Sequence, residues 1–302
     1  MTIFELCLAW NWEFDADFVN LLDTACQAHN LSLLQIRPDN LESLQNQLLT
    51  GESACLSFFD RASDEDDRFL PIVHWARQQE IFRINPYRQA RRAWNKATMH
   101  YEFIQAGLHT PHTIVLPPYQ LEPHLQPVEL DPLGSSFAIK PAHGGGGQGV
   151  VTEATSWDQV QHARQVFPMD HYLLQAHVVP TNLGEHQAWF RVIYCAGEIY
   201  PSWWDPFTHV YAPVTFDERH MYKLDLLWQI TSIIAITCQL DLFSTEIALT
   251  QYGQYKVIDY INDPIDLRLQ SKTTQGVPNT IVEGIAQRLV SLVVENLPAV
   301  RS

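Results

Sequence analysis

Residues 137–151 read FAIKPAHGGGGQGVV, an apolar run that ends in a lysine, then five glycines within six positions, then a second apolar pair. This pattern predicts a buried strand, a glycine turn and a second strand. Glycines in such a turn let the backbone approach a ligand closely and direct N–H groups at phosphate oxygens. Lys140, at the end of the first strand, adds a positive charge near the same phosphates. The segment therefore predicts a phosphate-covering hairpin, with a mobile surface hairpin as the plain alternative.

Other nucleotide-binding loops fit this segment less well. The spacing Gly144-x-Gly146-x-x-Gly149 matches a dinucleotide fingerprint, but that motif requires a helix after the glycines, and β-branched residues follow here. No Gly-Lys-Ser/Thr sequence closes the loop as in a Walker A motif. The chain also lacks the His-Arg-Asp and Asp-Phe-Gly sequences of protein kinases. A glycine hairpin between two strands is the interpretation that remains.

The composition excludes several classes of function. The 302 residues, 46% of them hydrophobic, can form two or three domains with cores of their own. No apolar run is long enough to span a bilayer, and the N-terminus lacks the basic region of a signal peptide, so we expect a cytoplasmic protein without a membrane partner. The formal charge of -15 argues against a nucleic-acid partner. It also means that a site for a polyanion such as ATP must gather its own cations.

The cysteines are scattered along the chain. Their odd number and the absence of any Cys-x-x-Cys spacing predict buried or incidental thiols in a reducing compartment, rather than a disulfide framework or a zinc site. They are Cys7, Cys26, Cys55, Cys195 and Cys238.

Roughly the first ninety residues alternate apolar strands with amphipathic helices. Strands are expected at 3–10, 31–36, 54–59 and 81–84, and helices at 18–29, 41–49 and 72–80. Strands and helices that alternate at this pitch predict a small parallel α/β domain.

Charged residues in the later strands mark a second group of candidates. Arg191 lies in an otherwise apolar strand and needs an anionic partner, which could be a carboxylate or a ligand phosphate. Glu246 and Asp259 lie on two strands joined by a glycine turn, with Asn262 just beyond. Such oxygen ligands suit Mg²⁺, although two exposed carboxylates and an Asx turn explain the same pattern.

These parts, in this order, resemble the ATP-grasp superfamily, most closely the branch of ribosomal-protein S6 modification enzymes, glutathione synthetases and D-alanine ligases. The resemblance rests on Asn95-Lys96 opening a helix that ends at Gly107, the lysine and glycine hairpin, a strand with Gln175, the arginine strand and the acidic hairpin. It covers essentially the whole chain and implies an α/β (α+β) fold. The implied parts are an N-terminal Rossmann-like pre-ATP-grasp domain (1–94), an N-lobe with the glycine hairpin (95–179) and a C-lobe with the metal site (180–302).

The resemblance also implies roles for single residues. Lys96 and Lys140 match two lysines that contact the α- and β-phosphates of ATP, and Arg191 matches an arginine that faces the transferred phosphoryl group or the acyl phosphate. The implied Mg²⁺ ligands are Glu246, Asp259 and Asn262. The phosphate-covering loop would comprise Gly144, Gly145, Gly146, Gly147, Gln148 and Gly149, and the adenine edge would meet the backbone at Gln175, Ala176, His177 and Val178.

Two stretches depart from the family pattern. The family commonly has Glu-x-Asn where this chain has Asp259-Tyr260-Ile261-Asn262, so either a β-bulge restores both groups to the metal or Asp263 takes over a role. Residues 264–270 replace the family's small-residue substrate loop, so no known substrate transfers to them. We hypothesise that Arg268 recognises a substrate carboxylate and joins Lys140 and Arg191 as a catalytic residue; a salt bridge with Asp266 is the alternative.

The resemblance implies an ATP-dependent ligase that joins a carboxylate to an amine or thiol through an acyl phosphate. Its cofactors would be ATP and Mg²⁺, its substrates small molecules or peptides, and a homodimer is compatible with it. Two other functions stay open at this point. One is a phosphotransferase acting on a hydroxyl group, and the other is a nucleotide-binding regulatory protein without turnover.

Overall fold

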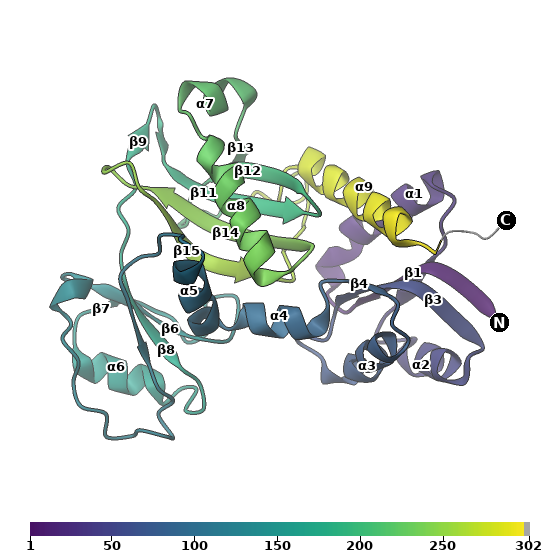
Figure 1. The fold of residues 1–302 in the computed structure, drawn as a ribbon, viewed down its shortest axis with the longest axis horizontal. Coiled ribbons are helices and arrows are strands. Elements are labelled where there is room, and N and C mark those ends of the chain that lie inside the picture. Colours follow the sequence, from purple (N-terminus) through teal and green to yellow (C-terminus); the bar gives the residue numbers. More distant parts are fainter. Residues whose placement is uncertain (299–302) are drawn as a thin grey trace.

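The N-terminal part of the chain forms a parallel sheet covered on both faces by helices (Figure 1). The computed structural model describes residues 1–298. The strand order is β2-β1-β3-β4, and every pair is parallel, which confirms the predicted α/β domain. The strands are β1 (Thr2–Trp10), β2 (Leu33–Ile36), β3 (Ser53–Arg61) and β4 (Phe82–Ile84). The helices are α1 (Ala16–Ala28), α2 (Leu41–Thr50) and α3 (Leu70–Gln78), with single 3-10 turns at Glu13–Asp15 and Asp67–Phe69.

The two faces of this sheet can be followed along β1, because successive side chains point to opposite sides of a strand. Leu6 and Leu8 pack in the core that contains α1, whereas Cys7 and Ala9 pack in the core that contains α2 and α3. All four side chains are completely buried. Burial on both faces explains the apolar run at residues 6–10 of β1.

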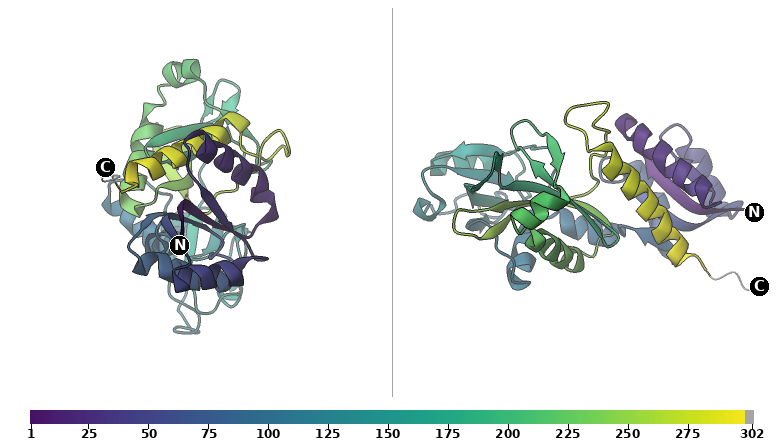
Figure 2. Two further views of the ribbon diagram at one scale, coloured as in Figure 1. Left: turned by 90° about the vertical axis from the view of Figure 1, so that its right-hand side faces the viewer. Right: turned by 90° about the horizontal axis from the view of Figure 1, so that it is seen from above.

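The last helix, α9 (Asn279–Asn296), belongs to the same core as α1. Its Ile285 and Leu289 are completely buried in the cluster that holds Phe18 and Leu22 of α1. The opposite side of this cluster contains Ile193 of the C-terminal sheet. The helix therefore lies between the N-terminal domain and the sheet of residues 180–262 (Figures 1 and 2), although it follows the latter in the chain.

One expectation about the cysteines is wrong. Cys7 of β1 and Cys55 of β3 form a disulfide bond, with their Cα atoms 6.0 Å apart and a sequence separation of 48. Strands β1 and β3 are parallel neighbours, and both cysteines belong to the core on the face that α2 and α3 cover. The other three cysteines are free and buried, as expected.

The middle of the chain forms an antiparallel sheet with the order β5-β8-β6-β7. Its strands are β5 (Thr113–Leu116), β6 (Phe137–Pro141), β7 (Val151–Ala154) and β8 (Tyr172–Ala176), with a 3-10 turn at Asp131–Leu133. The antiparallel pairing of β6 with β7 confirms the predicted glycine hairpin. The helices of this part are α4 (Tyr87–Trp94), α5 (Lys96–Gln105) and α6 (Trp157–Arg164).

A second antiparallel sheet, with the order β13-β12-β11-β14-β15, lies beside the first (Figure 1). Its strands are β11 (Trp189–Cys195), β12 (Glu198–Trp204), β13 (Tyr211–Pro213), β14 (Leu242–Leu249) and β15 (Tyr255–Asn262). The small ribbon of β9 (Asn182–Leu183) and β10 (His186–Gln187) precedes it, and helices α7 (Phe216–Met221) and α8 (Asp225–Cys238) lie between β13 and β14. Helices α5 and α8 pack on one face through Phe103, Leu227 and Phe243. Both hairpins predicted here are confirmed.

Within residues 1–298, no helix combines the length and the apolar character needed to cross a lipid bilayer.

We predict that α9 stabilises the whole fold and not only its own end of the chain. Replacing the completely buried Leu289 by Ala should lower the free energy of unfolding by about 2–5 kcal/mol, because the cavity lies between α1 and α9. The matched control is Val294→Ala on the same helix, where the side chain is 44% exposed and the loss should stay below about 1 kcal/mol. Urea unfolding followed by circular dichroism measures both, and equal losses would contradict the prediction.

Candidate active site

The glycine loop closes the β6–β7 hairpin, and residues 144–148 are exposed. Gly149 has φ +69°, and a Cβ at this position would lie 2.6 Å from the ring of Phe167. Both the backbone conformation and the close approach of the ring therefore require glycine here. Gly144, Gly146 and Gly147 also have positive φ angles. The loop has the backbone freedom that a phosphate-covering turn needs.

The two predicted lysines approach the base of this loop from different elements. Lys96 is the first residue of α5, and its Nζ donates to the carbonyl oxygen of Gly144 at 2.6 Å. Lys140, near the end of β6, donates from Nζ to Oε1 of Gln175 at 2.8 Å. Burial lowers the pKa of Lys96, and the positive charge of Lys140 lowers it further, whereas Asp259 opposes the shift. The structure thus brings Lys96, Lys140 and Asp259 into one electrostatic environment.

A buried chain of hydrogen bonds holds Lys140 in place. Gln175, which accepts from Lys140, donates from Nε2 to the hydroxyl oxygen of Tyr260 at 3.2 Å. That hydroxyl also bonds Nδ1 of His100 at 2.7 Å. Gln175, Tyr260 and His100 are each at most 4% exposed. Sequence reasoning assigned no role to Tyr260 or His100, since an aromatic or a histidine in an apolar segment gives no sign of its partner.

The loop is anchored at its start by a second polar cluster. His143 donates its backbone N–H to Oδ2 of Asp170, and its Nδ1 lies 2.8 Å from Oδ1 of the same carboxylate. Nε2 of His143 is 3.2 Å from the side-chain amide of Asn95, whose oxygen caps α5 by accepting from the N–H of Thr98. Burial alone would raise the pKa of Asp170, but the bonds from His143 outweigh it and lower the pKa. The cluster ties the glycine loop to the start of α5.

Arg191 has the carboxylate partner that was one of its two expected alternatives. It lies opposite Glu246 across β11 and β14, and the guanidinium is 2.9 Å from Oε1. It also donates to the hydroxyl of Ser244 at 3.1 Å, and Trp189 donates to the other oxygen of Glu246 at 3.1 Å. The side chains of Arg191 and Glu246 are only 15% and 12% exposed. The buried Nε of Arg191 has no partner within residues 1–298.

The expected bulge in β15 is confirmed. Glu246 pairs with Asp259, whereas Ser244 pairs with Asn262 and Ile247 with Val257, so the register shifts on both sides of Glu246. The extra residue of β15 is absorbed in this way, and Asn262 donates from Nδ2 to Oδ2 of Asp259 at 3.0 Å. Asp259 and Asn262 therefore stay adjacent despite their spacing.

The two carboxylates differ in how their surroundings shift their pKa values. Burial on its own would raise the pKa of Asp259, but Lys96, Lys140 and Arg191 outweigh it and lower the pKa. Burial raises the pKa of Glu246, and the negative charge of Asp259 adds to the effect. No group of three or more His, Cys, Asp or Glu side chains in the described chain is arranged to hold a metal ion. Two carboxylates and an amide oxygen nevertheless fit Mg²⁺, which commonly takes one or two carboxylates and completes its shell with water and phosphate.

The remaining predicted residues lie at the edges of this arrangement. Strand β8 ends at Ala176, so of the four residues expected at the adenine edge only Gln175 and Ala176 lie in the strand. The exposed His177 lies 3.6 Å from Glu153 of β7. Arg268 forms the salt bridge with Asp266, at 2.6 Å, that was the alternative to substrate recognition. Its guanidinium also lies 5.5 Å from the ring centre of Trp12. Recognition of a substrate carboxylate by Arg268 stays a prediction.

Comparison with known proteins finds matches to the structure of this chain but none to its sequence. No protein-family model and no curated protein matches the sequence. The structure of the ATP-grasp ligase PsnB, complexed with a minimal precursor, Mg and ADP, matches with a TM-score of 0.65 at 11% identity, over 97% of this chain and 98% of that one. The RimK domain protein ATP-grasp from Sphaerobacter thermophilus DSM 20745 matches with a TM-score of 0.64 at 15% identity, over 97% and 100%.

The chain has the ATP-grasp fold. A third structure, the D-cycloserine synthetase DcsG, agrees, with a TM-score of 0.62 at 14% identity over 96% of this chain and 99% of that one. The ATP-grasp resemblance and the α/β fold expected from the sequence are thereby confirmed.

We predict that the buried His100, at the end of the hydrogen-bond chain from Lys140, makes stability depend on pH. Burial lowers the pKa of His100 to about 4, and His112 contributes to the shift. The unfolded chain therefore takes up a proton at a higher pH than the folded protein, so stability is full above about pH 6.5 and falls as the pH drops towards 4. Between pH 7 and pH 5 the loss from this group should reach about 2 kcal/mol.

The measurement is urea unfolding at pH 5, 6 and 7. The variant His100→Gln should lose less stability than the wild type on acidification, because it has no imidazole to titrate. Tyr260→Phe removes the hydrogen-bond partner but keeps the imidazole, and should retain the pH dependence. Parallel pH profiles for the wild type and His100→Gln would contradict the assignment.

Proposed function

We propose that this protein is an ATP-dependent ligase that joins a carboxylate to an amine or thiol through an acyl phosphate. The observation that carries the proposal is that the charges of Lys96, Lys140 and Asp259 influence one another beneath a glycine hairpin. They do so in a chain whose net charge is -15. Polyphosphate binding needs positive charge of this kind, and an acidic protein must concentrate it locally. Further support comes from the ligases that share the fold.

In this proposal the lysines hold the phosphates. Lys96 and Lys140 would contact the α- and β-phosphates, and the N–H groups of the loop from Gly144 to Gly149 would cover them. Glu246, Asp259 and Asn262 would hold Mg²⁺, which when bound neutralises phosphate charge as the phosphoryl group is transferred. Gln175, held between Lys140 and Tyr260, would keep the lysine directed at the phosphates.

The proposed reaction has two steps. A carboxylate oxygen of the substrate attacks the γ-phosphorus, the bond to ADP breaks, and an acyl phosphate forms. The amine or thiol then attacks the carbonyl carbon, inorganic phosphate leaves and a proton is lost. Arg191 would stabilise charge on the transferred phosphoryl group. The glycine hairpin would exclude water, which would otherwise hydrolyse the acyl phosphate.

The substrates are proposed only as a class. PsnB is described with a precursor peptide, and DcsG is described as a synthetase of D-cycloserine, so the fold serves peptide and small-molecule ligases. Residues 264–270, where this chain departs from the family pattern, include the cis Asp263-Pro264 bond and the Asp266–Arg268 pair. We propose that a carboxylate of either class is activated at this site.

The first prediction concerns nucleotide binding. Lys140→Ala should weaken Mg²⁺-dependent ATP binding about tenfold or more, because a charge-assisted contact is worth roughly 1.5–3 kcal/mol. Lys272→Ala, which removes the same charge from an exposed position, should bind ATP like the wild type. Titration calorimetry measures all three proteins. Wild-type protein that does not bind ATP would refute the proposed function.

The second prediction concerns the intermediate. With ATP, Mg²⁺ and a panel of amino acids and short peptides, hydroxylamine should trap an acyl phosphate as a hydroxamate, with release of ADP. ADP release with a phosphate ester and no hydroxamate would instead identify a phosphotransferase. ATP binding without ADP release across the panel would identify a regulatory protein without turnover.

A further inference from the structure

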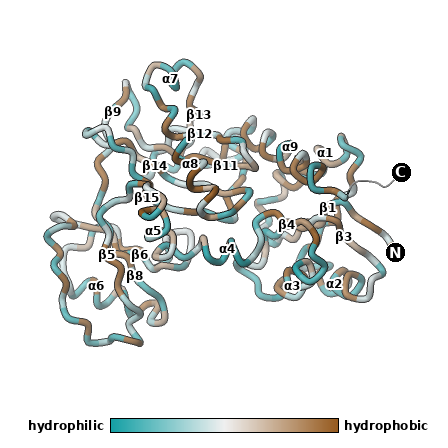
Figure 3. Tube along the Cα trace, viewed as in Figure 1, coloured by the Kyte–Doolittle hydropathy of each residue, from teal (hydrophilic) through white to brown (hydrophobic). Residues whose placement is uncertain are grey.

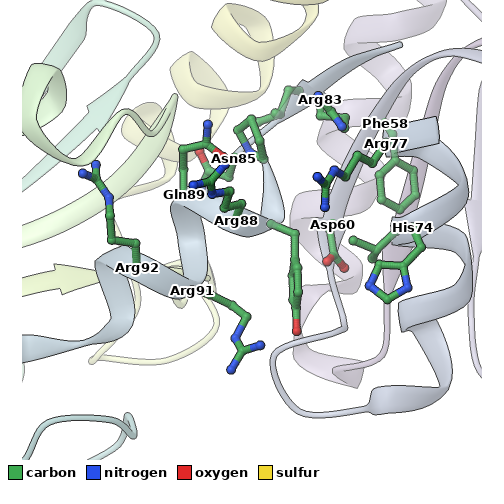
Figure 4. Close-up of a pocket in the computed structure, with 14 residues that line it drawn as sticks. Phe58, Asp60, His74, Arg77, Arg83, Asn85, Arg88, Gln89, Arg91 and Arg92 are labelled. Atoms are coloured by element: carbon green, nitrogen blue, oxygen red, sulfur yellow. The ribbon is translucent and has the colours of Figure 1, made fainter. Parts of the chain in front are cut away.

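A separate cavity of about 530 Å³ lies between α3 and α4, beside the carboxyl ends of β3 and β4 (Figure 4). Its lining includes Arg77 of α3, Arg83 of β4, and Arg88 and Arg91 of α4. None of the residues assigned above to ATP or Mg²⁺ lines it. In open α/β sheets the carboxyl ends of parallel strands are the usual place for a ligand. The position of the cavity and its four arginines together favour a negatively charged ligand.

These four arginines lack a carboxylate partner within residues 1–298. Each of the other arginines in that range except Arg164 forms an ion pair with Asp or Glu. The guanidinium of Arg164 instead donates to Gln161 and to the carbonyl oxygens of Pro117 and Glu122. The arginines without a partner inside the protein are thus concentrated in one cavity.

The cavity supplies little negative charge of its own. Its acidic side chain, Asp60, accepts hydrogen bonds from the backbone N–H groups of Ala62 and Ser63 and from the hydroxyl of Ser63. The buried Nε of Arg83 has no hydrogen-bond partner in the described chain. Arg77, Arg88 and Arg91 are exposed, so water screens part of their mutual repulsion, whereas Arg83 is half-buried. An anion in the cavity would supply the counter-charge that the protein itself does not.

Arg92 lies on the same helix but differs from these arginines, because it has partners inside the protein and a structural role. It pairs with Glu102 at 3.2 Å and donates to the carbonyl oxygen of Thr237 at 2.7 Å, so it joins α4 to α5 and α8. In Figure 4 it points to the opposite side of α4 from Arg91. Helix α4 contains no acidic residue, and Figure 3 shows it as hydrophilic. Arg88 and Arg91 are exposed and have no such packing role.

We propose that this cavity binds a small polyanion, carrying phosphate or several carboxylates, at a site separate from the nucleotide site. Guanidinium groups match both kinds of oxyanion through paired N–H donors. The four arginines beside Asp60 leave a net charge of +3, so about three negative charges would balance them. Val73, Ile84 and Tyr87 line the same cavity and provide an apolar wall for the organic part of the ligand.

The cavity is connected to the strand of the candidate metal site by one side chain. Asn85 lines the cavity, and its Nδ2 donates to Oδ1 of Asp263 at 2.7 Å, the residue after Asn262. Trp94, at the end of α4, donates to the other oxygen of Asp263 at 3.2 Å. A ligand in the cavity would therefore contact the helix that leads directly into Lys96.

The test is titration calorimetry with two probes, pyrophosphate and citrate, on the full chain. Four further proteins are compared with the wild type. Lys140→Ala should weaken binding at the proposed nucleotide site. Arg88→Gln/Arg91→Gln removes two cavity charges, and Arg77→Gln is a second, independent cavity variant. Arg37→Gln/Arg68→Gln is the matched control, because it removes the same charge from arginines that pair with Asp39 and Asp66 outside the cavity.

Pyrophosphate should bind Lys140→Ala, and in that background Arg88→Gln/Arg91→Gln should weaken binding about tenfold or more. Arg77→Gln should weaken it too, whereas the control pair should change it less than about twofold. If citrate also binds, and the same arginine variants weaken it, the cavity is a general polyanion site. If pyrophosphate binds and citrate does not, the cavity is a phosphate site. The proposal is overturned if Lys140→Ala abolishes all pyrophosphate binding, if the control pair weakens it equally, or if neither probe binds.

Discussion

The structure depends on concentrating positive charge around one half-buried carboxylate in a strongly acidic protein. Lys96, Lys140 and Arg191 come from three different elements and together keep the pKa of Asp259 low, although burial alone would raise it. Without those cations, an ionised Asp259 at this depth would be costly. The lysines in turn would repel each other without the carboxylate. Each charge is therefore tolerated because the others are present, and a bound triphosphate with Mg²⁺ would complete the same balance.

Polar contacts between the sheets fix where these charges lie. The chain from Lys140 through Gln175 and Tyr260 to His100 crosses from the middle sheet to β15 and α5. Because Gln175, Tyr260 and His100 are buried and bonded, none of them can rotate without leaving a polar group unsatisfied. The glycine loop, by contrast, is exposed and held mainly at its start through His143 and Lys96. A rigid base beneath an exposed loop is the arrangement that binding and covering a phosphate requires.

The N-terminal domain is more than a support for this site. Helix α9 packs against α1 and against the C-terminal sheet, so the end of the chain joins the two parts of the molecule. Arg61 of β3 crosses the same boundary, because it pairs with the buried Asp15 and donates to the carbonyl oxygen of Ile265 at 2.8 Å. The basic cavity lies near this boundary, with Asn85 between it and Asp263. The arrangement places two clusters of cations on either side of α4.

The sequence by itself determined the order of the elements and the type of most of them. Alternating strands and helices predicted the N-terminal domain, and the lysine and glycines of 137–151 predicted the hairpin, because periodicity and turn chemistry act over short distances. Only the tertiary structure decided which residues contact one another. The Cys7–Cys55 bond, the Arg191–Glu246 pair, the position of α9 and the His100–Tyr260 contact join residues far apart in the chain. Such partners depend on sheet register and helix packing, which no local pattern records.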